Sequence, residues 1–272
     1  MKSFARVGWV AALAVLVVVV YQSTFRVVAL QVSHDGYQHG YLVPLISAFL
    51  LWRSRDHLAE VPWRGSWLGV AVLAVSVWTW IVARTVAVGG VEQLAAVAMI
   101  WGLVLAVGGQ AFFRRAWFPL LYLIFALPFG SSAIRPLMEI TADLATAGLR
   151  VAGIPAYREG MLLWLPGGTF EVAEACSGLN YLNAGIALGV LVAHLMFKAV
   201  WRQVLYVAGA AAVFVLANGL RALIVMIIGS ATHLGKMVGV DHIVFGWVLF
   251  LVTLLAMTWL ARRYSDRHED GA

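Results

Sequence analysis

Three residues of this chain could together perform covalent acyl-transfer chemistry. Cys176, the only cysteine, lies where a polar stretch passes into an apolar run, and Arg221 and His242 accompany two later apolar runs. A thiolate is a strong nucleophile at neutral pH, a guanidinium can stabilise a developing oxyanion, and an imidazole can give or take a proton. These residue types therefore indicate attack on a carbonyl carbon through a thioester, provided that they meet in space.

The spacing along the chain predicts that the three residues share one face of a membrane. A helix rises 1.5 Å per residue, and a basic residue marks the far end of each apolar run. As a helix, the segment from Cys176 to Lys198 is about 33 Å long, the one from Arg202 to Arg221 about 28 Å and the one from His242 to Arg262 about 30 Å. Each length is close to a hydrocarbon core about 30 Å thick.

The apolar runs define the class of protein. Hydrophobic residues make up 62% of the chain and charged residues 12%, with a mean hydropathy of +0.89, which excludes an ordinary soluble domain. The runs are long enough to cross a bilayer as helices and lack the alternation of barrel strands. We therefore predict an all-α polytopic membrane protein. Its eight expected spans are 7–25, 38–52, 66–84, 91–111, 116–130, 177–197, 203–229 and 242–261.

The distribution of positive charge predicts the orientation in the bilayer. Lysine and arginine gather in every second expected loop, as the positive-inside rule requires of cytoplasmic segments. Both termini are then cytoplasmic, and the net charge of +6 does not indicate nucleic acid as a partner. The first run lacks a small-residue cleavage site, so we interpret it as an uncleaved span. No repeat or long linker divides the chain, and 1–272 is predicted to be a single transmembrane domain.

One segment, 131–176, is expected outside the bilayer on the outer side, inserted before the cysteine. From Arg135 to Arg150 polar and apolar residues alternate with helical spacing, which predicts an amphipathic helix in the outer interface. Two short apolar runs, 160–165 and 169–172, flank a Pro-Gly-Gly turn and predict a β-hairpin that leads to Cys176. Further on, Gly185 and Gly189 form a small-xxx-small pair that predicts close helix packing.

Structural alternatives exist for the cysteine. A lone Cys in an apolar protein is usually a buried filler. At a helix start, however, backbone N–H groups and the helix dipole favour a thiolate. Glu174 opposes this effect unless it pairs with a cation such as Arg221. Ser177, beside Cys176, could serve a serine hydrolase, but a thiol is the better nucleophile at neutral pH.

The arginine and the histidine also have alternatives. An Arg near the end of a span is normally a snorkelling anchor, yet Arg221 has apolar residues on both sides, which favours a functional role. His242 could cap a helix or pair with Asp241. We prefer it as the acid–base residue because it opens a span at the expected depth, with Asp241 and Asn218 as possible orienting groups. His39 is its strongest rival.

Other chemistries lack their residues. The chain has no His-Glu-x-x-His motif and no Walker loop, and every aspartate lies outside the expected spans. A single cysteine rules out an internal disulfide and a cysteine-based zinc site. No metal or organic cofactor is implied.

At this point several motifs resemble one family. The chain is similar to the exosortases, which are related to the archaeosortases, over nearly its whole length. The main matches are Glu174-Ala175-Cys176-Ser177-Gly178-Leu179-x-Tyr181-Leu182, Ala217-Asn218-Gly219-Leu220-Arg221-Ala222 and Gly239-Val240-Asp241-His242-x-x-x-Gly246-Trp247. Further matches are His39-Gly40-Tyr41-Leu42-Val43-Pro44-Leu45, Pro128-Phe129-Gly130 and Tyr157-Arg158-Glu159-Gly160.

The resemblance implies a polytopic cysteine protease or transpeptidase with Cys176 as nucleophile, Arg221 for the oxyanion or substrate positioning, and His242 as acid–base residue. The implied substrates are membrane-anchored proteins with a C-terminal Pro-Glu-Pro motif, one transmembrane helix and a basic tail. The implied location is the bacterial inner membrane, with the active site at the periplasmic face, in organisms that produce extracellular polysaccharide.

A second hypothesis belongs to another class of protein. The chain could be a non-catalytic membrane component of an exopolysaccharide biosynthesis or export system. Arg221 and His242 would then line a pathway or a subunit contact, and Cys176 would be packing. The substitution Cys176→Ser separates the two hypotheses, because it is nearly volume-neutral yet removes the thiol.

Overall fold

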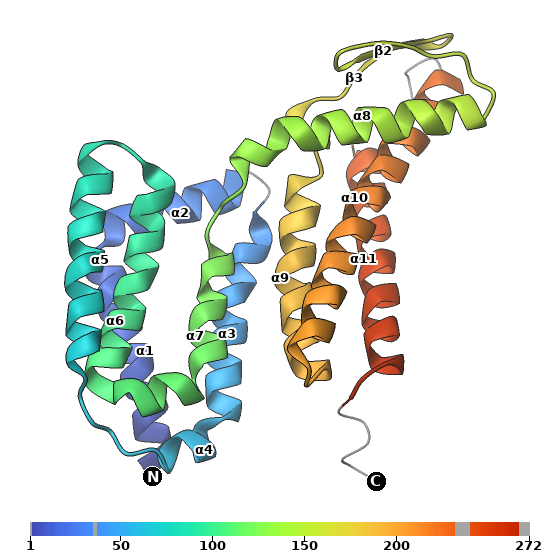
Figure 1. Cartoon of the computed structure of the whole chain (residues 1–272). Coiled ribbons are helices and arrows are strands. Elements are labelled where there is room, and N and C mark those ends of the chain that lie inside the picture. The colour runs from blue at the N-terminus through green and yellow to red at the C-terminus, as the bar shows by residue number, and fades with distance from the viewer. Residues whose placement is uncertain (1, 35–36, 232–239, 267–272) are drawn as a thin grey trace. The chain divides into compact units, whose positions relative to one another are not determined.

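The structure is a computed structural model that describes residues 2–34, 37–231 and 240–266. These residues are mostly helical, with one small antiparallel sheet. The chain forms two compact units, Met1–Phe129 and Gly130–Ala272 (Figure 1). The prediction that 1–272 forms one transmembrane domain stays a prediction.

The first unit is entirely helical. Its core is a cluster of buried apolar side chains that includes Leu58, Met99, Phe112 and Leu120. The elements are α1 (Lys2–Val20), α2 (Gln22–His34), η1 (Gln38–Tyr41), α3 (Leu42–Arg53), α4 (Arg55–Ala59), α5 (Trp67–Thr85), α6 (Gly89–Arg115), α7 (Trp117–Tyr122) and η2 (Leu123–Ala126).

The second unit contains the outer segment and three long helices. In Figure 1, α8 lies across the helices α9, α10 and α11, and the last turns of α10 continue past α8 to the strands. The elements are η3 (Ser131–Ala133), α8 (Ile134–Val151), β1 (Tyr157–Glu159), β2 (Leu162–Leu165), β3 (Gly168–Glu171), η4 (Glu174–Cys176), α9 (Leu179–Met196), α10 (Val200–Ala231) and α11 (Val240–Arg263).

The predicted amphipathic helix and hairpin are both confirmed. α8 buries Ala142, Ala145 and Leu149 in a cluster with Leu163 of β2 and Met226 of α10, because its apolar residues recur with helical spacing. β2 and β3 pair antiparallel around the Pro-Gly-Gly turn. The third strand, β1, pairs with β2 on the other side and was not predicted.

The predicted count of eight spans is not confirmed. Five helices of the described residues are long and apolar enough to cross a membrane, or seven segments if each of two bent helix pairs forms one span. The five are Trp67–Thr85, Gly89–Arg115, Glu174–Met196, Val200–Ala231 and Val244–Arg263. The expected span 38–52 contains only a 12-residue helix, α3, about 18 Å long, and 116–130 breaks up into α7 and η2.

The expected first span, 7–25, breaks at Tyr21, where the chain bends by 90° between α1 and α2. The polar side chains of α2 explain the turn, because they bond to α5 and α6. Thr24 Oγ1 donates to Glu92 Oε1 at 2.5 Å and accepts from Trp80 Nε1 at 3.0 Å. Gln93 Nε2 donates to Gln31 Oε1 at 2.7 Å. Buried polar groups require such partners, and an uninterrupted apolar helix would leave them unpaired.

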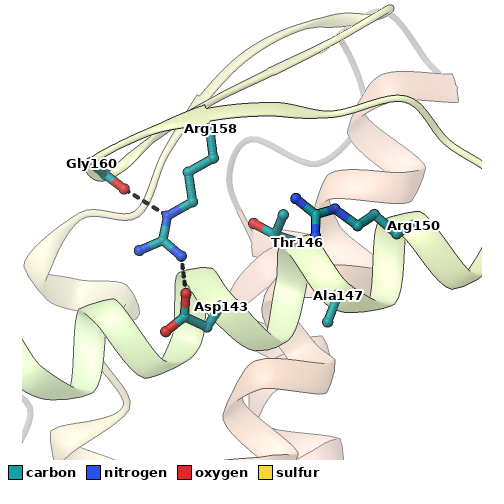
Figure 2. A pocket seen from close by; sticks show the side chains of 6 residues that line it. All are labelled: Asp143, Thr146, Ala147, Arg150, Arg158 and Gly160. Carbon is teal, nitrogen blue, oxygen red and sulfur yellow. Dashed lines mark hydrogen bonds and ion pairs between the residues drawn. The ribbon is translucent and has the colours of Figure 1, made fainter.

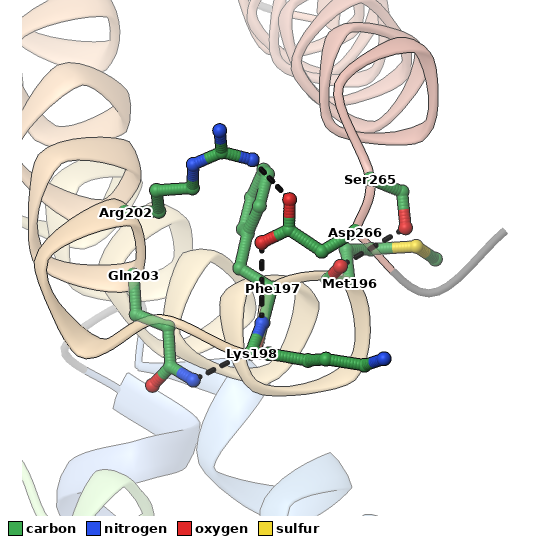
Figure 3. A network of polar contacts seen from close by, with 7 residues as sticks. All are labelled: Met196, Phe197, Lys198, Arg202, Gln203, Ser265 and Asp266. Carbon is green, nitrogen blue, oxygen red and sulfur yellow. Dashed lines mark hydrogen bonds and ion pairs between the residues drawn. The ribbon is translucent and has the colours of Figure 1, made fainter. Parts of the chain in front are cut away.

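A network of polar contacts ties the end of α11 to the turn between α9 and α10 (Figure 3). Asp266 forms an ion pair with Arg202 and accepts from the backbone N–H of Lys198. The Asp266 N–H and the Ser265 hydroxyl both donate to the carbonyl of Met196, at 3.1 and 2.9 Å. This end of α9 is opposite to the end that carries Cys176, so the network holds the three helices together away from the cysteine.

The small-xxx-small prediction is confirmed where α9 packs on α10. A Cβ added at Gly185 would lie 2.5 Å from Cε2 of Phe214, whereas one at Gly189 would lie 3.5 Å from Cβ of Ala210. We expect Gly185→Ala to lower the free energy of unfolding by roughly 1–3 kcal/mol through overpacking. Gly189→Ala serves as the matched control and should be neutral or slightly stabilising. Thermal unfolding in detergent checks this, and equal melting temperatures for the two variants would contradict it.

Candidate functional site

Cys176 lies in a tight turn directly before α9. The turn is closed by the N–H groups of Cys176 and Ser177, which donate to the carbonyls of Ala173 and Glu174 at 2.8 and 3.0 Å. The thiol is free and partly exposed, and no described residue forms a hydrogen bond or ion pair with it. Glu174 is exposed and is not paired with Arg221. The side chain of Cys176 is therefore accessible without a neighbouring ion pair among the described residues.

Ser177 is the less suitable nucleophile of the two neighbours. Its side chain is only 5% exposed, and its Oγ accepts the N–H of Leu179, the first residue of α9, at 3.3 Å. A hydroxyl that satisfies an orphan N–H at a helix start has a structural role. The accessible thiol and the buried hydroxyl support the sequence-based preference for Cys176.

Asn218 holds the backbone of the cysteine. Its buried Nδ2 donates to the carbonyl of Cys176 at 2.9 Å and to Oγ1 of Thr141 at 3.0 Å. One amide thus joins the turn, α10 and α8. These two bonds show that Asn218 holds the backbone of Cys176, and its expected role in orienting His242 stays a prediction. Its Oδ1 is buried and has no partner among the described residues.

Gly178 makes this arrangement possible. Its φ is +78°, and a Cβ there would lie 2.5 Å from Cγ of Asn218. We expect Gly178→Ala to cost more than about 2 kcal/mol of stability. An alanine would be strained in the left-handed backbone conformation, and its Cβ would also overlap Asn218, so the two costs add. Gly153→Ala is the matched control, because Gly153 has a φ of +73° and nothing within 4 Å of a Cβ. Thermal unfolding of both variants checks this, and equal losses would show that the Asn218 contact is not tight.

Arg221 is buried among α9, α10 and α11 and is not a snorkelling anchor. Its side chain is 7% exposed, Nη1 donates to the hydroxyl of Tyr181 at 3.2 Å, and Cζ lies 5.1 Å from the centre of the Tyr181 ring. Tyr181 in turn stacks on Phe250 of α11 at 5.5 Å. Gly246 lets α11 approach, because a Cβ there would lie 3.2 Å from Nη1 of Arg221.

The guanidinium has unused donors. Its Nε is buried and has no hydrogen-bond partner among the residues that the structure describes, and none of their carboxylates pairs with it. It borders a cavity of about 10 Å³ between the three helices, room for about one water molecule. A buried cation with no counter-ion among the described residues favours a functional role over a structural one.

Asn218 links the backbone of Cys176 to α10, three residues before Arg221 on the same helix. The side chains of Cys176 and Arg221 contact different partners. Cys176 packs at the edge of the apolar cluster beneath α8, whereas Arg221 contacts α9 and α11. Thr141 and Tyr181 were not predicted as site residues, and only the presence of Tyr181 in the cysteine motif hinted at its position.

The two candidate histidines stay predictions. Asp241 and His242 lie in the first turn of α11, so they open the last long helix as expected, but their side chains are outside the described residues. His39 belongs to the first unit, in η1, where its ring lies 6.2 Å from that of Tyr37. Burial lowers the pKa of His39 from its ordinary value of 6.5.

These features define a polytopic helical membrane protein with a free cysteine at the start of a long helix and a buried arginine on the next. Residues 31–259 match the family model described as transmembrane exosortase (Exosortase_EpsH), which covers well over half of the chain. The chain therefore belongs to the transmembrane exosortase family. No curated protein and no solved structure matches it.

Proposed function

We propose that this chain is a membrane-embedded cysteine peptidase or transpeptidase that cleaves C-terminal sorting signals of exported proteins at the outer face of the bacterial inner membrane. The observation that carries the proposal is the accessible thiol of Cys176, whose backbone is anchored by Asn218, three residues before Arg221; the Nε of Arg221 has no partner among the described residues. Membership of the exosortase family supports it, since the matched region contains all three predicted catalytic residues.

In the proposed reaction the Cys176 thiolate attacks the scissile carbonyl carbon and forms a C–S bond. The carbonyl electron pair moves to oxygen, where donors of the Arg221 guanidinium stabilise it. The tetrahedral intermediate then collapses, the C–N bond breaks, and His242 gives a proton to the leaving amine. Water or an amine attacks the resulting thioester, which releases the product and restores the thiolate.

The proposed substrates are membrane-anchored proteins that end in a Pro-Glu-Pro motif, one transmembrane helix and a basic tail. The helix would dock against the spans, and the motif would lie at the outer interface, at the depth of Cys176. This part of the proposal follows from the family resemblance.

A processing assay in membranes tests the proposal. A tagged protein with such a C-terminal signal is co-expressed with the full chain and followed by gel shift, beside a twin substrate that lacks Pro-Glu-Pro. We expect cleavage of the first substrate only, and loss of cleavage with Cys176→Ser, Arg221→Lys and His242→Ala at matched expression. Absence of cleavage by the wild-type chain would overturn the proposed substrate class, and normal export function with Cys176→Ser would favour the non-catalytic hypothesis.

A further inference from the structure

A second polar site lies between α8 and β1. It is a pocket of about 420 Å³, a volume typical of pockets that hold small ligands or side chains (Figure 2). Four lining residues come from one stripe of α8, because they are three or four positions apart, and two come from β1 and the turn that follows it. The lining residues are Asp143, Thr146, Ala147, Arg150, Arg158 and Gly160.

The two arginines of the pocket differ in their partners. Arg158 is fixed, since Nη1 pairs with the carboxylate of Asp143 and Nε donates to the carbonyl of Gly160 at 2.8 Å. Arg150 is exposed and forms no hydrogen bond or ion pair with a described residue. Figure 2 shows the Arg150 side chain beside Thr146, on the same side of α8 as Arg158. With Asp143 neutralised by Arg158, the pocket has a net charge of +1 and an unpaired cation.

A cation at the last turn of a helix can also serve only to complement the helix dipole. Arg150 has that position in α8. The dipole does not account for Arg158, which reaches the same pocket from a strand and is held there by two contacts. Two guanidinium groups from different elements around one pocket are typical of a site for an anion.

The position of the pocket favours a polypeptide as the source of the anion. All the residues that line the pocket belong to α8, β1 and the turn after β1, and none of them belongs to the apolar helices α9, α10 and α11. β1 is an edge strand of the sheet, and an edge strand can pair with an extended peptide. The single net charge suits a carboxylate better than a phosphate dianion.

The pocket is rigidly connected to the cysteine. Thr141, which bonds to Asn218, and Thr146, which lines the pocket, both belong to α8 and are about 8 Å apart along its axis. Asn218 makes the remaining connection, since its Nδ2 donates to Oγ1 of Thr141 at 3.0 Å and to the carbonyl of Cys176 at 2.9 Å. We propose that the pocket binds the carboxylate side chain of an extended polypeptide whose neighbouring residues reach Cys176. This inference rests on the proposed function, because the pocket would hold the peptide that Cys176 cleaves.

Binding to the full chain with Cys176→Ser tests the pocket independently of turnover. The protein is placed in phosphatidylcholine nanodiscs and titrated against fluorescein-labelled ten-residue peptides with blocked ends, one with a single Glu and one with Gln in its place. We expect the Glu peptide to bind at least about ten-fold more tightly. Arg150→Gln should remove that difference, and Arg150→Lys should reduce it, since a lysine keeps the charge but not the planar fork.

Arg135→Gln is the matched control, because Arg135 is an exposed arginine of the same helix that pairs with Glu139 outside the pocket. This variant should bind the Glu peptide like the parent. Equal binding of both peptides, or no binding of either, would overturn the inference. Two further results would overturn it. The Arg150-dependent difference between the peptides could disappear when phosphatidylglycerol replaces part of the phosphatidylcholine, or when inorganic phosphate is added at millimolar concentration. In either case the occupant of the pocket would be a phosphate and not a carboxylate. Cleavage by the wild-type chain is measured separately, so that failure of the pocket and failure of the proposed function are distinguishable.

Discussion

Replacing Cys176 by serine is expected to lower the rate of processing by roughly a thousand-fold or more while the protein stays folded. The thiol is partly exposed and has no hydrogen-bond partner among the described residues, so the nearly volume-neutral change should leave the packing unaltered. A serine hydroxyl at the same place is a far weaker nucleophile without a strong base beside it. The measurement is the initial rate of signal removal in membranes, together with the melting temperature of the purified variant.

Ser177→Ala is the matched control for this prediction. It removes the hydroxyl that accepts the N–H of Leu179, so we expect a loss of about 1 kcal/mol of stability and a normal rate of processing. If Ser177→Ala abolished processing and Cys176→Ser did not, the nucleophile would be the serine. If both variants processed the signal normally, the covalent mechanism would be wrong.

The sequence predicted those parts of the fold that local periodicity specifies. The apolar runs gave the membrane class, and the helical spacing of 135–150 and the Pro-Gly-Gly turn gave α8 and the β2–β3 hairpin. The count of spans could not be predicted in this way, because hydropathy measures composition and not direction. The bend at Tyr21 depends on Thr24, whose partners Trp80 and Glu92 are far away in the chain.

In the candidate site, too, local patterns predicted some features, whereas others depend on contacts between distant parts of the chain. Helix lengths predict a common depth for Cys176 and Arg221, and the structure links the backbone of Cys176 to Asn218, three residues before Arg221. Two features of the site depend on packing between helices that are distant in the sequence. One is the bond from Asn218 to the carbonyl of Cys176, and the other is the positive φ of Gly178, which packs against Asn218. No local pattern encodes such contacts, and β1, with only three residues, was too short to recognise.

Replacing Arg221 by lysine is expected to lower the rate of processing by about a hundred-fold or more, although the positive charge is kept. The guanidinium is planar, contacts the Tyr181 ring and keeps donors that no described residue uses. A lysine has a single flexible ammonium group that cannot contact the ring and reach an oxyanion with fixed geometry. The loss should appear in kcat more than in KM, since the interaction would be made mainly in the transition state.

The matched control for this change is Arg202→Lys at the other end of α10. Arg202 pairs with Asp266 near the surface, so its replacement should alter the rate of processing by less than about two-fold. Thermal unfolding separates lost chemistry from lost packing around Tyr181. An Arg221→Lys variant that raised KM with an unchanged kcat would place Arg221 in substrate positioning. One that processed the signal at the wild-type rate would remove Arg221 from the mechanism altogether, and helix packing would then explain its burial.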